Sequence, residues 1–338
     1  MKVSFHKPVL SFVAALSIVC GSVTAQAQSG AVIAQAKKEG RVSYYGTQDM
    51  AAANAMIRSF QETYPFIKVD LFRQGTTGLM TRVLAEAQAG KHGFDVISLG
   101  IMEIQLLKKK ELVARYSSPE AKEFAAGLKD KDGHWTAMSV LQFVIGYNTS
   151  MMSGKKIPRG WHDLLNPIWK GGQIGAERDG TVWYASLLQY WGKEKGVQFM
   201  KQLSAQQPHL ERGNTLRTQM MAAGEFPMAI VHAHKVEQFK AKGAPLDWVT
   251  TADPIVTQPF VMATARHARN PNAARLFLDF VLSKQGQGVI KENGSMPARP
   301  DMAPIAPSLD QSKLKVHYVD PALAENYNQF AKEYQEIF

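Results

Sequence analysis

The sequence has 338 residues and a formal net charge of +10, from 39 Lys and Arg against 29 Asp and Glu, and it contains one cysteine. One cysteine excludes a disulfide framework within the chain and any site built from several thiolates. The positive charge is scattered, and no basic stripe is interleaved with aromatic residues, so we expect a surface with some bias toward anions and no nucleic-acid partner.

Residues 1–27 are predicted to be a cleavable export signal. A positively charged start precedes an apolar run over residues 9–19, which is too short to span a bilayer. Ala25-Gln26-Ala27 has the small-x-small cleavage pattern, so we expect a mature chain that begins near Gln28 and resides in the periplasm. A lipoprotein anchored at Cys20 is the alternative, and the bulky residues before that cysteine disfavour it.

The next part of the chain alternates between strand and helix patterns. Short runs rich in residues that favour β-strands alternate with longer segments whose apolar residues have helical spacing. This alternation predicts an α/β fold with a mostly parallel sheet and helices on both faces. We expect helices over residues 32–40, 51–64, 79–89 and 102–110, and strands over residues 41–45, 67–72 and 95–99.

The remainder of the chain is again mixed, and the length suggests two domains. Asn270 is expected to cap a helix that has Pro271 in its first turn. We expect strands over residues 134–138, 143–148, 173–176, 228–231, 246–250 and 260–265. We expect helices over residues 182–191, 196–203, 216–223, 236–241, 271–282, 285–292 and 321–338.

A His-Ala-His motif follows the short apolar strand over residues 228–231. Side chains two residues apart on an extended chain point the same way. His232 and His234 would then face one cleft together at the carboxyl end of a strand, where open α/β sheets bind ligands. The alternative is that both are ordinary polar residues closing a strand.

Several motifs, in this order and after an export signal, resemble the extracellular solute-binding proteins of bacterial ABC importers. The similarity is to the group that includes ferric-ion-, thiamine- and phosphonate-binding periplasmic proteins, and it covers nearly all of the mature chain. The motifs are Phe60-Gln61-Glu62-Thr63-Tyr64-Pro65, Phe94-Asp95-Val96-Ile97, Val144-Ile145-Gly146-Tyr147-Asn148, Gly160-Trp161-His162-Asp163-Leu164-Leu165-Asn166-Pro167 and Asn270-Pro271-Asn272-Ala273-Ala274-Arg275.

This resemblance implies a two-lobed, type II-like periplasmic binding protein. Each lobe is a mixed or parallel sheet flanked by helices, and two crossing segments near residues 116–122 and 251–260 form the hinge. The first lobe is expected to contain residues 28–118 and 258–285, and the second residues 119–257 and 286–338. The resemblance further implies a monomer that closes over a small-molecule ligand and delivers it to an ABC permease at the inner membrane, without a cofactor.

Three loops have the composition of anion sites at strand ends and helix starts. They surround Thr47 and Gln48, Thr76 and Thr77, and Arg178 to Thr181, and capped helix starts with a surface charge are the alternative. Tyr44, Tyr45 and Trp183 could form aromatic walls, although we expect Tyr44 in the core. The predicted ligand-binding residues are Tyr45, Thr47, Gln48, Thr76, Thr77, Arg178, Asp179, Thr181, His232 and His234.

The predicted ligand is a small organic anion, such as a carboxylate or phosphonate. Ferric-binding relatives carry two adjacent tyrosines where this chain has Ala233-His234, and often a histidine where it has Gln48. Phenolate oxygens are suitable ligands for Fe³⁺. Two imidazoles are better ligands for softer divalent metals, or they can form hydrogen bonds to an anion. A ferric or other metal ion held by His232 and His234 is the alternative. Protonation of either histidine is predicted to strengthen anion binding below neutral pH.

We expect no enzymatic activity. Two pairs of residues could in principle act as a general acid and a general base. They are Asp163 with His162 and Glu177 with Asp179. No nucleophile is placed beside them, and the Gly-x-Ser-x-Gly and His-Glu-x-x-His motifs are absent. A hydrolase, or a sensor or receptor subunit that uses the same fold, are the less favoured alternatives.

Overall fold

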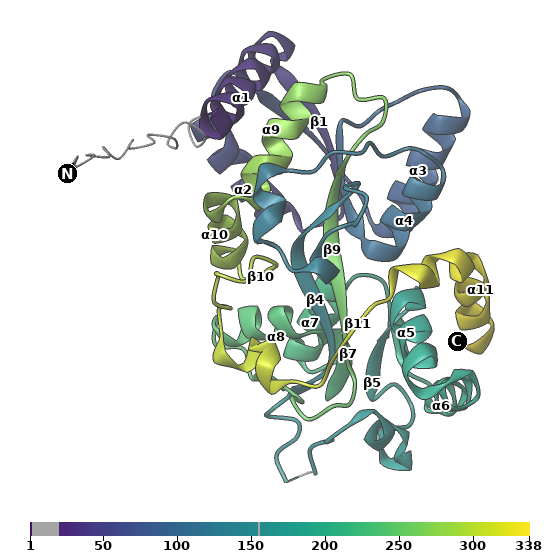
Figure 1. Ribbon diagram of the computed structural model, residues 1–338. Helices are drawn as coiled ribbons and strands as arrows, with labels where there is room; N and C mark the ends of the chain where they lie inside the picture. The colour runs from purple at the N-terminus through teal and green to yellow at the C-terminus, as the bar shows by residue number, and fades with distance from the viewer. Residues whose placement is uncertain (2–19, 155) are drawn as a thin grey trace.

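The computed structural model describes residue 1, residues 20–154 and residues 156–338, with side chains from residue 30 onward. It has two lobes, one above the other in Figure 1, and the long strands β4 (Thr136–Asn148) and β9 (Ile255–Thr264) run between them. The predicted export signal and its cleavage site lie outside the residues with described side chains. None of the described helices combines the length and apolarity that crossing a membrane requires.

The first lobe contains a mixed sheet in the strand order β2-β1-β3-β9-β4. β1, β2 and β3 are parallel to one another, and β9 is antiparallel to both β3 and β4. One face of the sheet is covered by α1, α2, α9 and α10, and the other by α3 and α4 (Figure 1). The bounds are β1 Arg41–Gly46, β2 Lys68–Arg73, β3 Val96–Gly100, β10 Met296–Pro297, α1 Cys20–Glu39, α2 Met50–Thr63, α3 Thr76–Gln88, α4 Ile101–Lys109, α9 Pro271–Leu282 and α10 Lys284–Glu292.

The second lobe is built on the sheet β4-β7-β5-β6, with β8 also paired to β4. Figure 1 shows α7 and α8 on one side and α5, α6 and α11 on the other. The bounds are β5 Ile174–Glu177, β6 His209–Glu211, β7 Met228–His232, β8 Leu246–Trp248, β11 Val316–Tyr318, α5 Thr181–Trp191, α6 Lys193–Ala205, α7 Asn214–Ala223, α8 Ala233–Lys240 and α11 Tyr327–Ile337. Short 3-10 helices are Pro119–Glu123, Ala126–Leu128, Trp161–Leu165, Pro167–Trp169, Pro307–Leu309, Gln311–Lys313 and Pro321–Asn326.

β4 is one continuous strand where the sequence predicts two. It pairs with β9 as far as Gln142, opposite Thr257, and with β7 from Phe143, opposite His232. Gln142 is polar yet only 2 % exposed, so the hydrophobic pattern breaks where the strand passes from one lobe to the other. The change of hydrogen-bonding partner places this crossing inside β4.

Residues 119–135 precede this crossing and pack on the first lobe. Lys108 at the end of α4 lies 2.9 Å from Asp130 Oδ2, and the 3-10 helix Pro119–Glu123 contacts α9. α10, beyond residue 285, packs against α2. We therefore place the first lobe boundary near Gln142 and keep α10 in the first lobe, in place of the boundaries expected at residues 118 and 285.

Asp95, 1 % exposed, joins three segments of the first lobe. Its carboxylate accepts hydrogen bonds from the backbone N–H of Ser43, Arg269 and Asn270. Asn270 occupies the predicted N-cap position of α9, but its side-chain amide donates to Asp95 at 2.9 Å and makes no cap bond. The predicted side-chain cap is replaced by Glu39, whose carboxylate accepts from the backbone N–H of Asn272 and Ala273 at 3.0 and 2.7 Å.

Candidate functional site

The loops that follow the parallel strands of both lobes meet where the lobes touch. Lys235 Nζ, at the start of α8, lies 2.6 Å from Asp49 Oδ2, at the start of α2. Thr77 Oγ1, at the start of α3, lies 3.5 Å from Asp179 Oδ2, in the loop before α5. These two contacts join the first lobe to the second, so the predicted anion loops lie at one junction.

Within the first lobe the loop after β1 is held by Gln48. Its Oε1 accepts hydrogen bonds from the Tyr44 hydroxyl at 2.5 Å and the Ser98 hydroxyl at 3.0 Å. Its backbone carbonyl accepts from Arg73 Nε at 2.9 Å, which ties this loop to the one after β2. Thr47 and Thr76 are half-buried beside these contacts. Gln48 therefore fixes the first-lobe wall of the junction.

Tyr45 does not reach this wall. Its ring packs on Phe72 and Phe94, with centroid separations of 4.9 and 5.8 Å, and its hydroxyl donates to Glu86 Oε1 at 3.2 Å. Adjacent residues on a strand face opposite sides of the sheet, so Tyr44 points to Gln48 and Tyr45 away from it. Tyr44 is 1 % exposed and lies in the core, as expected. Tyr45 is also buried, and it makes none of the contacts described for the junction.

Trp183 is also a core residue. It is 3 % exposed and packs on Trp161 with a centroid separation of 5.2 Å. It therefore forms part of the second-lobe core, and the predicted aromatic wall from this residue is wrong.

The loop before α5 presents Asp179 and not Arg178. Arg178 is exposed, and its guanidinium donates to the backbone carbonyl of Leu210 at 3.0 Å, alongside β6. Asp179 instead pairs with Arg212 at 3.2 Å. Thr181, the first residue of α5, is 5 % exposed. Arg212, which no sequence motif marks, is the arginine that pairs with Asp179 beside the junction.

The two histidines are brought together, as their spacing predicts, but not on an extended chain. His232 ends β7 and His234 lies in the first turn of α8. Their rings stack with a centroid separation of 5.7 Å and an interplanar angle of 24°. The His232 backbone N–H donates to Asn214 Oδ1 at 2.8 Å, which joins the starts of α7 and α8. Phe143 packs edge-on against the His232 ring at 4.8 Å.

Both imidazoles are neutral at physiological pH in this structure. Burial, with the neighbouring His234 charge as a second cause, holds the pKa of His232 well below its usual value of 6.5. Burial and the adjacent Lys235 ammonium lower the pKa of His234 to about 3. The predicted protonation of this pair just below neutral pH is therefore wrong for the ligand-free chain, and the rings can offer only a neutral N–H or a lone pair.

Four buried polar atoms at the junction have no hydrogen-bond partner within the described part of the chain. They come from the point where β4 changes lobes and from the first turns of α4, α7 and α8. They are Gln142 Nε2, Glu103 Oε2, Asn214 Nδ2 and His234 Nδ1. Buried polar groups in proteins are nearly always paired, so these four atoms are candidates for contacts with a ligand.

The helices that begin here also leave backbone donors free. The N-caps of α3, α4, α5, α7 and α8 make no side-chain cap bond, unlike α2, where Asp49 accepts from Ala52 N at 2.9 Å. Uncapped helix starts expose N–H groups and the positive end of the helix dipole. This junction therefore suits negatively charged groups.

The enzyme alternatives have no support in the geometry. The carboxylate of Asp163 accepts from the backbone N–H of Arg159 and Gly160, at 2.7 and 3.2 Å. The His162 ring packs on Trp191 at 5.1 Å. Glu177 pairs with the buried Arg217 at 2.7 Å. Each of these groups is engaged in a structural role.

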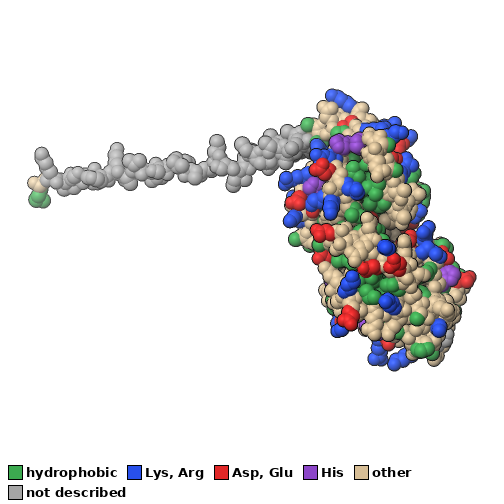
Figure 2. Space-filling view, turned by 90° about the vertical axis from the view of Figure 1, so that its right-hand side faces the viewer, with side chains coloured by type: hydrophobic (Ala, Val, Ile, Leu, Met, Phe, Trp, Pro, Cys, Tyr) green, Lys and Arg blue, Asp and Glu red, His purple; other side chains and the backbone are tan. Residues whose placement is uncertain are grey.

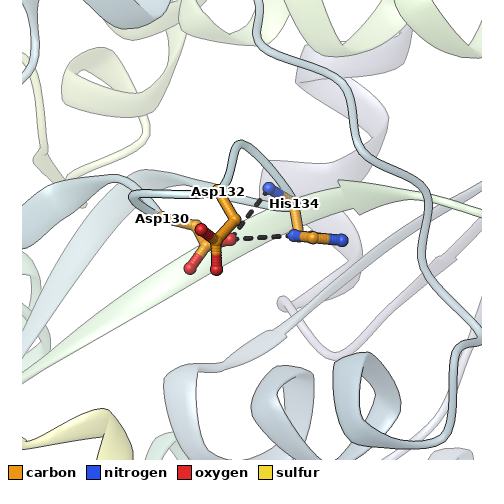
Figure 3. A group of neighbouring side chains, drawn as sticks. All are labelled: Asp130, Asp132 and His134. Atoms are coloured by element: carbon orange, nitrogen blue, oxygen red, sulfur yellow. Dashed lines mark hydrogen bonds and ion pairs between the residues drawn. The ribbon is translucent and has the colours of Figure 1, made fainter.

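A three-residue group with metal-ligand side chains lies elsewhere, in the turn before β4. Figure 3 shows Asp130, Asp132 and His134 around one point. The Lys108 ammonium lies 2.9 Å from carboxylate oxygens of both aspartates, so a cation already pairs with both. This group is an ion-pair network. Within the described residues, His232 and His234 belong to no such three-ligand group.

On the face drawn in Figure 2, positive charge is not gathered into one patch. In the view of Figure 2, Lys and Arg side chains are interspersed with Asp and Glu over both lobes. A small hollow in the first lobe, lined in part by Glu86, His92 and His267, lies away from the junction, behind α3. The lobe junction therefore remains the candidate site.

Comparison with known proteins agrees with this geometry. A family model described as bacterial extracellular solute-binding protein matches residues 94–320. The Fe(3+)-binding periplasmic protein of Serratia marcescens is 21 % identical over 352 aligned positions, covering 96 % of this chain and 98 % of that protein. An uncharacterized protein of Haemophilus influenzae is 26 % identical over 278 positions, covering 78 % and 79 %.

Solved structures share the fold. Iron-bound HitA from Pseudomonas aeruginosa has a TM-score of 0.79 at 19 % identity, covering 88 % of this chain and 99 % of its own. AfuA from Actinobacillus pleuropneumoniae, with fructose-6-phosphate bound, has a TM-score of 0.80 at 22 % identity, covering 88 % and 98 %. The two-lobed α/β fold predicted from the sequence is thus confirmed. Because the family model spans more than half of the sequence, this chain belongs to the bacterial extracellular solute-binding proteins, the periplasmic solute-binding family of ABC transporters.

Proposed function

We propose that this chain is a periplasmic, monomeric binding protein that captures a small organic anion between its lobes and delivers it to an ABC permease. The ligand would carry a carboxylate or a phosphate. The observation that carries this proposal is the two unpaired buried amide donors among the four unpaired atoms. Gln142 Nε2 and Asn214 Nδ2 are donors, and they lie among uncapped helix starts that also donate. An anion would accept hydrogen bonds from all of them.

The positive side chains at the junction agree with this choice. Arg212 and Lys235 each lie on the second-lobe wall, paired with Asp179 and Asp49 respectively. Arginine supplies a planar fork that matches carboxylate and phosphate geometry. An organic anion with further polar groups would use the donors that a simple inorganic ion leaves unpaired.

A metal ion is the second candidate, because two of the similar proteins are named or described as binding iron. In this chain the junction offers neutral imidazoles and no tyrosine pair at residues 233–234, and hard Fe³⁺ prefers anionic oxygen ligands. The stacked rings with an unpaired Nδ1 instead fit a softer divalent ion such as Zn²⁺ or Ni²⁺.

Calorimetric titration of the ligand-stripped protein separates these candidates. The panel is fructose-6-phosphate, citrate, inorganic phosphate, ferric nitrilotriacetate, ZnCl₂ and NiCl₂. The proposal expects at least one organic anion to bind at least about tenfold more tightly than phosphate or any metal, which corresponds to about 1.4 kcal/mol. Tight binding of a metal with no effect of the organic anions would reject it.

A further inference from the structure

An ion pair joins the two lobes beside the candidate site. Lys235 Nζ lies 2.6 Å from Asp49 Oδ2, with side-chain exposures of 10 % and 33 %. The same ammonium donates to Gln238 Oε1 at 2.9 Å. Burial, the largest single influence, raises the pKa of the Asp49 carboxyl, but the hydrogen bonds from Lys235 and the Ala52 N–H and the charges of Lys235 and Arg73 together lower it. The Asp49 carboxylate is therefore ionised at neutral pH.

Both partners are anchored within their own lobes. Asp49 is the N-cap of α2, where its Oδ1 accepts from Ala52 N at 2.9 Å. Lys235 is held by Gln238 one turn further along α8. Other strong ion pairs stay within a lobe, such as Arg41 with Asp70 on the neighbouring strands β1 and β2, at 2.5 Å. The Lys235–Asp49 pair can form only when the two lobes are together.

We propose that Lys235 and Asp49 form a latch that stabilises the closed arrangement of the lobes before ligand binds. Separation of the lobes breaks the pair and returns both charges to water. A contact made only in the closed state raises the closed population and, by the same factor, the apparent affinity for any ligand that needs closure. The link to ligand affinity rests on the proposed function, whereas the effect on lobe position does not.

Two variants each remove one charge of the pair, and a third serves as a control. Asp49→Asn keeps a good N-cap for α2 but removes the charge that Lys235 meets. Lys235→Met keeps the aliphatic stem of the lysine and removes its ammonium. Asp70→Asn removes the ion pair with Arg41 inside the first lobe and serves as the matched control.

The test measures the distance between the lobes without any ligand. Spin labels at K91C and K195C, exposed positions on the first and second lobes, report the open and closed populations by pulsed electron double resonance in a Cys20→Ser background. We expect Asp49→Asn and Lys235→Met each to lower the closed-to-open ratio roughly tenfold, as close charge pairs across an interface do. The double variant should fall no further than either single one.

Three outcomes overturn the latch. The first is an unchanged distance distribution in Asp49→Asn. The second is additive losses in the double variant, which would mean that the residues act separately. The third is an equal shift in Asp70→Asn. Thermal unfolding of each variant shows whether it is folded. Because the measurement contains no ligand, its failure leaves the calorimetric test of anion binding unaffected, and the reverse also holds.

Discussion

His234 is a buried, neutral imidazole whose Nδ1 has no partner within the described residues. Its ring stacks on His232, and Lys235 is the next residue in the chain. A buried group of this kind costs stability unless a partner completes it. The unpaired Nδ1 of His234 therefore lowers the stability of the ligand-free fold.

The buried His234 makes stability depend on pH. Its folded-state pKa of about 3 is below its usual value of 6.5, so the unfolded chain takes up a proton first as pH falls. The stabilisation is complete above pH 6.5 and is lost on acidification. Urea unfolding at pH 7 and pH 5 should show that His234→Gln loses less stability than the parent chain, by about 2 kcal/mol.

His209→Gln is the control for this measurement, because His209 is exposed on β6. That variant keeps the buried His234, so it should lose more stability than His234→Gln between pH 7 and pH 5. A pH dependence that is the same in all three proteins would contradict the assignment of a depressed pKa to His234.

Asn214→Asp tests the sign of the ligand charge with almost no change in shape. Oδ1 can still accept from the His232 N–H, but an anionic oxygen replaces the unpaired Nδ2 donor. We expect titration calorimetry to show at least about tenfold weaker binding of the organic anion, because hydrogen bonds to charged groups contribute about 1.5–3 kcal/mol. Asn54→Asp, at an exposed position on α2, is the control. Tighter metal binding with unchanged anion binding would favour the metal alternative.

At the scale of elements, α10 begins in close contact with the end of α9. A Cβ atom at Gly286 would lie 2.2 Å from the backbone oxygen of Phe280 and 2.7 Å from Val281 Cα. At Gly288, in the same helix, a Cβ would meet no atom within 4 Å. A side chain at residue 286 would therefore clash with α9, whereas a side chain at residue 288 would fit.

Alanine substitutions at these positions should have opposite effects. Gly286→Ala forces α9 and α10 apart and should destabilise the chain by about 1–3 kcal/mol. Gly288→Ala removes only the flexibility of glycine and should stabilise it by about 0.5–1 kcal/mol. Denaturant unfolding of both variants measures this difference. Equal effects would show that the two helices do not approach as closely as described.

Most helices and strands can be predicted from the sequence because their hydrophobic periods are clear. The prediction of strand bounds is wrong for β4, which pairs with strands of both lobes. β4 is interrupted in the hydrophobic pattern by buried polar residues such as Gln142. The three predicted anion loops lie at one junction, but the sequence does not show which of their side chains face it. Tyr44 and Tyr45 are adjacent in the sequence and both are buried, so composition does not separate their surroundings. Lys235 becomes notable only when Asp49, 186 positions away, is known to lie beside it.

At the scale of the whole molecule, the two lobes are joined by β4, β9 and contacts across the junction. Lys235 with Asp49 and Thr77 with Asp179 lie in the same region as the unpaired buried atoms. The C-terminal segment adds a further link, because Tyr327 donates to Glu103 at 3.2 Å on α4. A ligand that contacts both walls would stabilise the closed form by its differential affinity for it.

The charge and composition of the natural ligand are measured most directly by native mass spectrometry of the protein purified from the periplasm, with metal analysis of the same sample. The account predicts one added mass per chain, released on denaturation as an organic carboxylate or phosphate, and a metal content far below one atom per chain. A stoichiometric metal ion without an organic anion would contradict it.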